Sequence, residues 1–186
     1  MGKEEKQWFI AYVRSCQEKR VAQALQEAGE NCYLPMRQEK RQWSDRTKIV
    51  DVLLLKGMIF IQTFESRRAT LLSAIFGLSA FMFDRATHRP AVVPDAQMQV
   101  FMRMVDRHPE QVQLSTEHFS PGDRVRVLSG SMSGMEGELV RVGTHHRLLL
   151  RLNSVMNATM DIDVSEVEKI NPDEAAEEHT NQQHKK

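Results

Sequence analysis

The first hundred positions of the chain alternate between strand-like and helix-like spacing of apolar residues. The stretch QWFIAYVRS, residues 7–15, is apolar and aromatic, which is typical of a buried strand. Apolar residues then recur at helical spacing as far as Gly29, and Ser15 with Glu18 predicts a capping box at the helix start. Further strands are predicted at 32–36, 56–64 and 78–84, and further helices at 66–77 and 95–105. This order of elements predicts an α+β fold close to a ferredoxin-like sandwich.

The pattern changes in the second half of the chain, where only short strands are predicted. Residues 106–118 have no apolar periodicity and contain Pro109, so we expect a linker there. The stretches DRVRVL, GELVRV, RLLLRLN and ATMDIDV then alternate with period two at intervals of about 8–12 residues, which predicts a small β-barrel over 119–171. Residues 172–186 are polar, and we expect a disordered tail.

Three glycines, Gly130, Gly134 and Gly137, separate the first two strands of the predicted barrel. Glycine is favoured where strands turn sharply or backbones approach closely, so we expect a loop across the barrel mouth. Met132 and Met135 lie in this loop. If they are exposed, these flexible apolar side chains suit a protein or RNA partner. The alternative, in which they fold back over the barrel end, is equally consistent with the sequence.

The zero net charge of the 186 residues conceals an uneven distribution. Residues 6–105 contain 15 Lys and Arg against 9 Asp and Glu, whereas residues 119–171 contain 6 against 7. The basic first half indicates contact with nucleic acid, although a solvated surface has the same composition. The stretch 37–48 concentrates this charge, with five basic and two acidic residues, and we expect an exposed hairpin.

The sequence gives little support to catalysis, metal binding or membrane insertion. Cys16 and Cys32 are isolated, which indicates free thiols in a reducing compartment. No spacing defines a nucleophile with its base, a phosphate loop or a zinc site, so we expect no enzyme activity, no cofactor and no metal. No apolar run is long enough for a membrane span, and the charged N-terminus lacks a signal-peptide core. We therefore expect a cytoplasmic protein with no membrane partner.

The stretch GDRVRVLSGSMSGMEGELVRV resembles a KOW motif, the small barrel of NusG-type transcription factors and some ribosomal proteins. The first half resembles the NGN domain of the same family, in WFIAYVRSCQEKRVAQAL, CYLPM, KGMIFIQTF and PAVVPD, and the closing VSEVEKI also matches. The resemblance runs in order from about residue 7 to 170. It implies an NGN α/β sandwich at 6–105, followed by an SH3-like KOW barrel at 119–171.

The stretch RQEKRQWSDRTKIVDVLLLKG resembles specialised paralogues of the UpxY type, which are related in role to RfaH and LoaP. The resemblance implies an elongation or antitermination factor for long operons, such as those for capsular polysaccharide. The expected molecule is a monomer that binds RNA polymerase. The alternative is a KOW-containing RNA-binding or ribosome-associated protein.

In this family the NGN domain binds the clamp helices of the polymerase β′ subunit through an apolar depression. The matching residues are Tyr12, Met58 and Phe60, and strand alternation places Met58 and Phe60 on one side. KGM replaces the PGY that is typical of the family. The alternative is that the three residues belong to the core.

The resemblance implies three further surfaces. Arg67, Arg68 and Thr70 match the helix start that approaches the gate loop of the β subunit, although a polar helix turn is equally consistent. The KOW loop around Met132 and Met135 matches the site for a ribosomal small-subunit protein or the termination factor Rho. Residues expected near upstream or non-template DNA are Arg14, Lys19, Arg20, Arg37, Lys40, Arg41, Trp43, Arg46 and Lys48.

Trp43 stands among the basic residues of the expected hairpin. An exposed indole ring there could stack on an unpaired base, a contact that tolerates any sequence. The alternative is a solvated basic loop with Trp43 folded against the domain.

Overall fold

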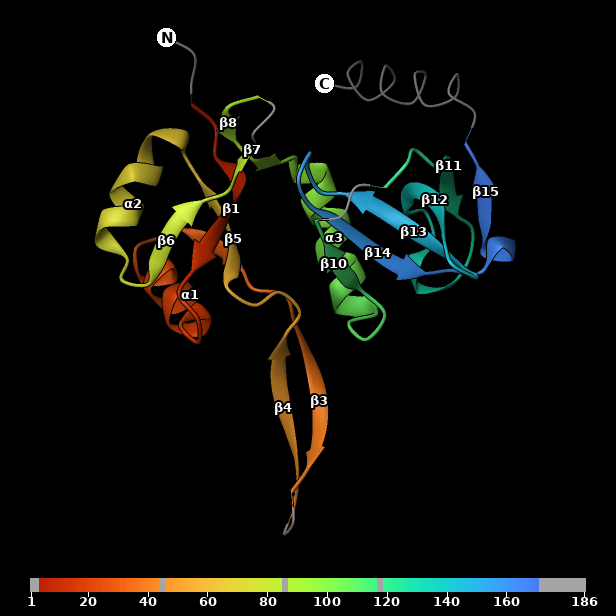
Figure 1. Ribbon diagram of the computed structural model, residues 1–186, viewed down its shortest axis with the longest axis horizontal. Coiled ribbons are helices and arrows are strands. Elements are labelled where there is room, and N and C mark those ends of the chain that lie inside the picture. The colour runs from red at the N-terminus through yellow and green to blue at the C-terminus, as the bar shows by residue number, and fades with distance from the viewer. Residues whose placement is uncertain (1–3, 44–45, 85–86, 117–118, 171–186) are drawn as a thin grey trace, which may run out of the picture.

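The N-terminal part of the chain is built around one antiparallel sheet. The computed structural model describes residues 4–43, 46–84, 87–116 and 119–170. The sheet has the strand order β2–β5–β1–β6, with β9 also paired to β1 (Figure 1). The bounds of these strands are β1 Gln7–Val13, β2 Asn31–Tyr33, β5 Met58–Thr63, β6 Leu78–Phe81 and β9 Val92–Val93. Two-residue strands β7 (Phe83–Asp84) and β8 (Arg89–Pro90) pair with each other.

Helices cover both faces of this sheet because successive side chains of a strand point to opposite faces. Phe9 and Ala11 of β1 pack with α1 (Glu18–Glu27) and α2 (Arg68–Ala74), which follows the short turn η1 (Glu65–Arg67). Trp8 and Ile10 belong to a second apolar cluster, which includes α3 (Asp95–Arg107). The expected α+β architecture is confirmed.

The predicted capping box at Ser15 does not form. The N-cap of α1 is Gln17, and it makes no side-chain cap hydrogen bond. Glu18 is buried, and its Oε1 instead accepts a hydrogen bond of 2.8 Å from the backbone nitrogen of Gly57. The carboxylate therefore joins α1 to the residue just before β5, a distant partner that local sequence does not reveal.

The polar stretch after β2 forms the expected hairpin. Strands β3 (Met36–Gln42) and β4 (Thr47–Leu53) pair over seven residues on each side, from Met36 opposite Leu53 to Gln42 opposite Thr47. They make a sheet of their own that projects away from both domains (Figure 1).

The C-terminal part is a six-stranded antiparallel sheet with the order β10–β14–β13–β12–β11–β15. The turns η2 (Gly130–Met132) and η3 (Val164–Glu166) lie between its strands. In the turn, Gly134 has φ +81°, whereas Gly137 lies in β12, where a Cβ would meet the Leu149 carbonyl oxygen at 2.9 Å. The strands are β10 Gln113–Ser115, β11 Asp123–Val127, β12 Glu136–Val142, β13 His145–Arg151, β14 Asn157–Asp161 and β15 Val167–Lys169.

The segment 106–118 is not the simple linker that its polarity suggests. Its first residues continue α3 as far as Arg107, and β10 pairs with β14 of the C-terminal sheet. Val112, just before β10, is 3% exposed and joins the larger apolar cluster. With only three residues, β10 is too short to show an alternation of apolar and polar residues in the sequence, so the sequence analysis missed it. The predicted tail at 172–186 lies outside the described residues.

Helix α3 lies between the two sheets (Figure 1). Phe101 packs against Phe60 of the N-terminal sheet, with ring centres 5.3 Å apart and the rings tilted by 48°. On its other side, His108 contacts the Ser131 hydroxyl, and the Gln97 side-chain amide faces the carbonyl oxygens of Arg151 and Leu152. One helix therefore serves both halves of the chain. No helix in the described ranges is both long and apolar enough to cross a bilayer.

Candidate functional site

The first candidate surface is a row of side chains across the N-terminal sheet. Tyr12 of β1 is paired with Met58 of β5 on one side and with Ala80 of β6 on the other. Paired residues of antiparallel strands share a face of the sheet. Tyr12 is 39% exposed, Ala80 is exposed and Met58 is partly buried. The row thus presents a partly exposed tyrosine between a methionine and a small alanine side chain.

Phe60 does not belong to this exposed row, which corrects the expectation from the sequence. It is fully buried, and its ring lies 6.4 Å from that of Tyr33 and 5.3 Å from that of Phe101. Tyr33 is the residue opposite Phe60 on β2, and burial raises the pKa of its hydroxyl, with a smaller effect from Asp106. This neighbouring row lies against α3, so Phe60 supports the surface from beneath.

A second surface combines basic residues with an aromatic ring that the sequence analysis missed. The guanidinium carbons of Arg14 and Arg20 each lie 5.4 Å from the ring centre of Phe76. Phe76 is 60% exposed and stands just before Gly77, whose carbonyl accepts a bond of 2.9 Å from the Arg14 backbone nitrogen. In the sequence, Phe76 reads as the end of a helix, so only the three-dimensional approach of β1, α1 and α2 reveals it. Lys19 lies apart, 3.7 Å from Asp51 of β4.

The residues predicted to approach a gate loop divide into two groups. Arg68 lies over the rings of Phe9 and Phe81, 5.2 and 5.5 Å from their centres, and its side chain is 19% exposed. Arg67 lies 2.9 Å from a carboxylate oxygen of the buried Glu30. Both arginines thus hold the start of α2 to the domain, whereas Thr70 is exposed.

The β3–β4 hairpin divides its basic residues between two faces. Arg41 is paired with Lys48 on one face, and Lys40 is paired with Ile49 on the other. Trp43 is 54% exposed, and the Arg46 guanidinium carbon lies 6.0 Å from its ring centre. Trp43 therefore does not fold against the domain.

Arg37, at the base of the hairpin, has intramolecular partners. Its Nη2 bonds Glu39, and its Nε lies 4.0 Å from Glu110. The Arg37 hydrogen bond is the main cause that lowers the pKa of Glu39, and Arg41 adds to it from 3.6 Å. Arg37 and Arg41 thus share Glu39 as an intramolecular partner.

The loop between β11 and β12 does not expose its methionines. Met132 is 4% and Met135 is 1% exposed, and both lie in the cluster that includes α3. The expectation of exposed partner-binding methionines is therefore wrong, and the alternative of methionines folded over the barrel end is correct. The apolar residues exposed near this end are Leu128 (50%) and Val164 (46%), and Val164 lines a groove of about 600 Å³.

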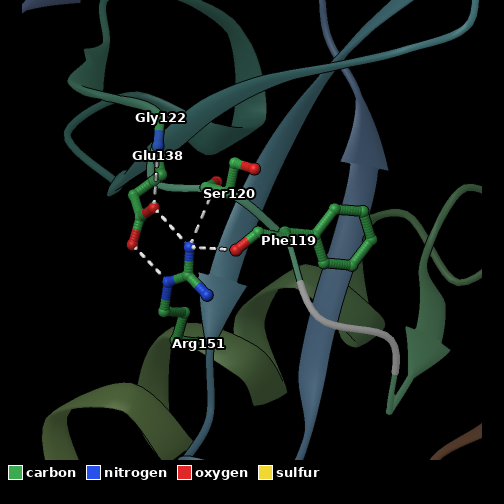
Figure 2. A network of polar contacts seen from close by, with 5 residues as sticks. All are labelled: Phe119, Ser120, Gly122, Glu138 and Arg151. Carbon is green, nitrogen blue, oxygen red and sulfur yellow. Dashed lines mark hydrogen bonds and ion pairs between the residues drawn. The ribbon is translucent and has the colours of Figure 1, made fainter.

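Polar contacts fix the entry to the C-terminal sheet, as Figure 2 shows. Arg151 donates from Nε and Nη2 to the two carboxylate oxygens of Glu138, at 2.7 and 2.9 Å. Its Nη2 also reaches the carbonyl oxygens of Phe119 and Ser120, and Glu138 accepts from the Gly122 nitrogen at 3.2 Å. The Arg151 hydrogen bond lowers the pKa of Glu138. This paired arginine holds the strand entry and leaves no free charge for a ligand.

The sandwich with its long hairpin, followed by a small β domain, is the architecture of an NGN-type transcription factor. The model of a family described as "Transcription termination factor nusG" matches residues 6–102. That span is more than half of the chain, and the chain belongs to the NusG family.

The matches among solved structures include two of low identity. "Domain interaction in Thermotoga maritima NusG" has a TM-score of 0.48 and 19% identity, and the match covers 89% of this chain and 98% of that chain. "Crystal Structure of MjSpt4:Spt5 complex conformation B" has a TM-score of 0.30 and 14% identity, with coverage of 88% and 97%. No curated protein matches the chain.

Proposed function

We propose that the protein is a transcription elongation or antitermination factor that binds RNA polymerase through its N-terminal sheet. Family membership supports this role, and the observation that carries it is the exposed row of Met58, Tyr12 and Ala80. A tyrosine flanked by an adaptable methionine and a small residue suits the side of a partner helix. The proposed partner is the clamp-helix pair of the β′ subunit.

The factor has no chemistry of its own in this proposal. It spans the polymerase cleft, with the Tyr12 row on β′ and the exposed start of α2 around Thr70 facing β. A ligand shifts a conformational equilibrium only by its difference in affinity for the two states. A preference of about 3 kcal/mol for the elongating state would change the ratio of paused to active complexes more than a hundredfold.

DNA contact is assigned to the surface made by Arg14, Arg20 and Phe76. Its two guanidinium groups beside an exposed ring suit phosphates next to an unstacked base. We further propose that the factor is a UpxY-like paralogue serving long operons. Its C-terminal β domain is proposed to act as a KOW domain that binds a ribosomal small-subunit protein or Rho, with Leu128 and Val164 as the accessible apolar residues.

Co-purification of tagged protein with RNA polymerase tests the proposal. We expect the wild type to retain polymerase and Tyr12→Ala to weaken the complex by about 10- to 100-fold, because buried aromatic anchors dominate interfaces. Phe83→Ala is the matched control, since Phe83 is 52% exposed but lies outside the row. Polymerase recovery that is equal for the two variants would overturn the assignment of the surface. Recovery of ribosomes instead of polymerase would favour the alternative of a ribosome-associated protein.

A further inference from the structure

Near its tip, the β3–β4 hairpin carries a pair of like charges that costs stability, and among the described residues only one of the two has an acidic partner. Arg41 and Lys48 are directly paired across the two strands, and like charges in such pairs are destabilising. Lys48 makes no ion pair within the described part of the chain, while Arg41 shares Glu39 with Arg37. An anion placed beside both residues would relieve this repulsion.

The exposed aromatic ring lies at the same end of the hairpin. The Trp43 backbone nitrogen donates to the Arg46 carbonyl oxygen at 2.8 Å, which continues the ladder one step beyond the Gln42–Thr47 pair. Strand alternation therefore places Trp43 on the face of Arg41 and Lys48. Its indole is 54% exposed under the Arg46 guanidinium. We call these four residues, Arg41, Trp43, Arg46 and Lys48, the tip face.

We propose that the tip face binds a single strand of nucleic acid, with one unpaired base stacked on Trp43 and the flanking phosphates on Arg41 and Lys48. A stacking ring combined with cations that follow a backbone is the arrangement used for unpaired strands without sequence preference. A duplex offers phosphates but no open base, so its binding would use the cations alone. The chemistry is shared by a displaced DNA strand and a transcript.

The opposite face of the hairpin provides an internal comparison. Lys40 lies on the same strand as Arg41, but its paired residue is Ile49, which is 57% exposed. This face carries a cation beside an aliphatic side chain and has no aromatic ring among its described residues. Lys40→Ala and Lys48→Ala therefore remove the same charge at neighbouring positions of the same hairpin, one from each face.

The test measures binding of the full-length protein to labelled oligonucleotides of about 12 nucleotides, a length within the usual range of single-strand sites. Single-stranded DNA, single-stranded RNA of the same sequence and the DNA duplex are compared by fluorescence anisotropy. Tryptophan fluorescence in a Trp8→Phe background reports stacking on Trp43, because Trp8 is the buried tryptophan. This inference rests on the proposed function and specifies a nucleic-acid contact within it. Because the binding assay contains no polymerase, loss of oligonucleotide binding would contradict this inference without bearing on polymerase binding.

We expect both single strands to bind more tightly than the duplex and to quench Trp43. Trp43→Ala should weaken single-strand binding about tenfold, and Trp43→Phe should restore most of it. Lys48→Ala should weaken binding and reduce the salt dependence by about 0.7 in log–log slope, whereas Lys40→Ala should change affinity less than about twofold. A preference for DNA or for RNA would identify the source of the strand.

Three results would overturn the proposal. The first is duplex binding as tight as single-strand binding. The second is affinity unchanged in Trp43→Ala. The third is an equal effect of Lys40→Ala and Lys48→Ala, which would reduce the hairpin to a general basic surface. Trp43, Lys48 and Lys40 are all exposed, so these variants should fold like the wild type.

Discussion

Replacing Glu138 by glutamine should destabilise the C-terminal domain by about 1–2 kcal/mol. The carboxylate receives two hydrogen bonds from Arg151 and one from the Gly122 nitrogen, and the two side chains are only 23% and 30% exposed. Hydrogen bonds to charged groups contribute about 1.5–3 kcal/mol each when desolvated, and partial exposure reduces this value. Glutamine keeps the shape of the side chain but leaves the guanidinium of Arg151 without its counter-charge.

The matched control for this change is Glu136→Gln. Glu136 pairs with Arg124 and Arg126 on the same sheet, but its side chain is 37% exposed. More exposed pairs contribute less, so we expect a loss of about 0.5 kcal/mol. Urea unfolding followed by circular dichroism gives the free energy of unfolding of each variant. Equal losses in the two variants would refute the argument that the Arg151–Glu138 contact fixes the strand entry.

The same pair predicts a dependence on pH. Arg151 lowers the pKa of Glu138 in the folded state, so the unfolded chain binds the proton more readily. The contribution of the pair is therefore complete above the unfolded-state pKa of about 4.3, and it is lost as the pH falls through the folded-state pKa. The difference in free energy between wild type and Glu138→Gln should shrink over that interval. A difference that stays constant from pH 7 to about pH 3 would contradict this linkage.

Three further predictions concern positions where the fold depends on distant contacts. Gly137→Ala should lower the free energy of unfolding by about 2–4 kcal/mol, because the new Cβ would approach the Leu149 carbonyl oxygen to 2.9 Å. Gly134→Ala should lower it by about 1 kcal/mol, because only its positive φ is unfavourable for alanine. Thermal unfolding that ranks the two variants in the reverse order would contradict this argument. Glu18→Ala should lower the free energy of unfolding by about 1–3 kcal/mol, and Ser15→Ala should lower it by less than about 0.5 kcal/mol. The opposite order in urea titrations would instead support a capping box at Ser15. A C-terminal fragment that begins after β10 should have a free energy of unfolding about 2 kcal/mol lower than a fragment that also includes Val112 and β10. Identical melting curves for the two fragments would show that β10 is dispensable.

The sequence predicted those parts of the fold that depend on local periodicity. The aromatic β1, the helices and the short strands after residue 119 all appear at or near their expected positions. The basic hairpin was also predicted, from the polar stretch 37–48, but its second strand continues through the largely apolar residues 49–53. The family assignment followed from motifs in the correct order, and the match over residues 6–102 supports it.

The exposure of individual site residues could not be predicted in the same way. Tyr12 and Phe60 both match the expected apolar surface, yet Tyr12 is 39% exposed and Phe60 is fully buried. The difference depends on which sheet rows α3 covers. Phe76 was missed because its two arginine neighbours, one just after β1 and one in α1, lie far from it in sequence. Pairing register and helix placement, both non-local, decide such cases.

Helix α3 shows most clearly how a pattern can be correct and incomplete. The spacing of Met98, Phe101, Met102 and Val105 predicts the apolar face of this helix; three of them are buried, and Met102 is only partly buried. Met104 is also fully buried, on the neighbouring strip of the helix with Gln97 and His108, whose contacts are with the C-terminal domain. A single amphipathic pattern cannot show that a helix has two partners.

The burial of Met132 follows from this second face of α3. The methionine lies in the apolar cluster that α3 shares with the C-terminal domain, so its burial and the domain contact are parts of one arrangement. By linkage, a partner that needs Met132 exposed binds more weakly by the free energy of that contact. A partner that uses Leu128 and Val164, which are already exposed, bears no such cost. The affinity of the full chain for a partner that needs Met132 exposed therefore depends both on the loop between β11 and β12 and on its contact with α3.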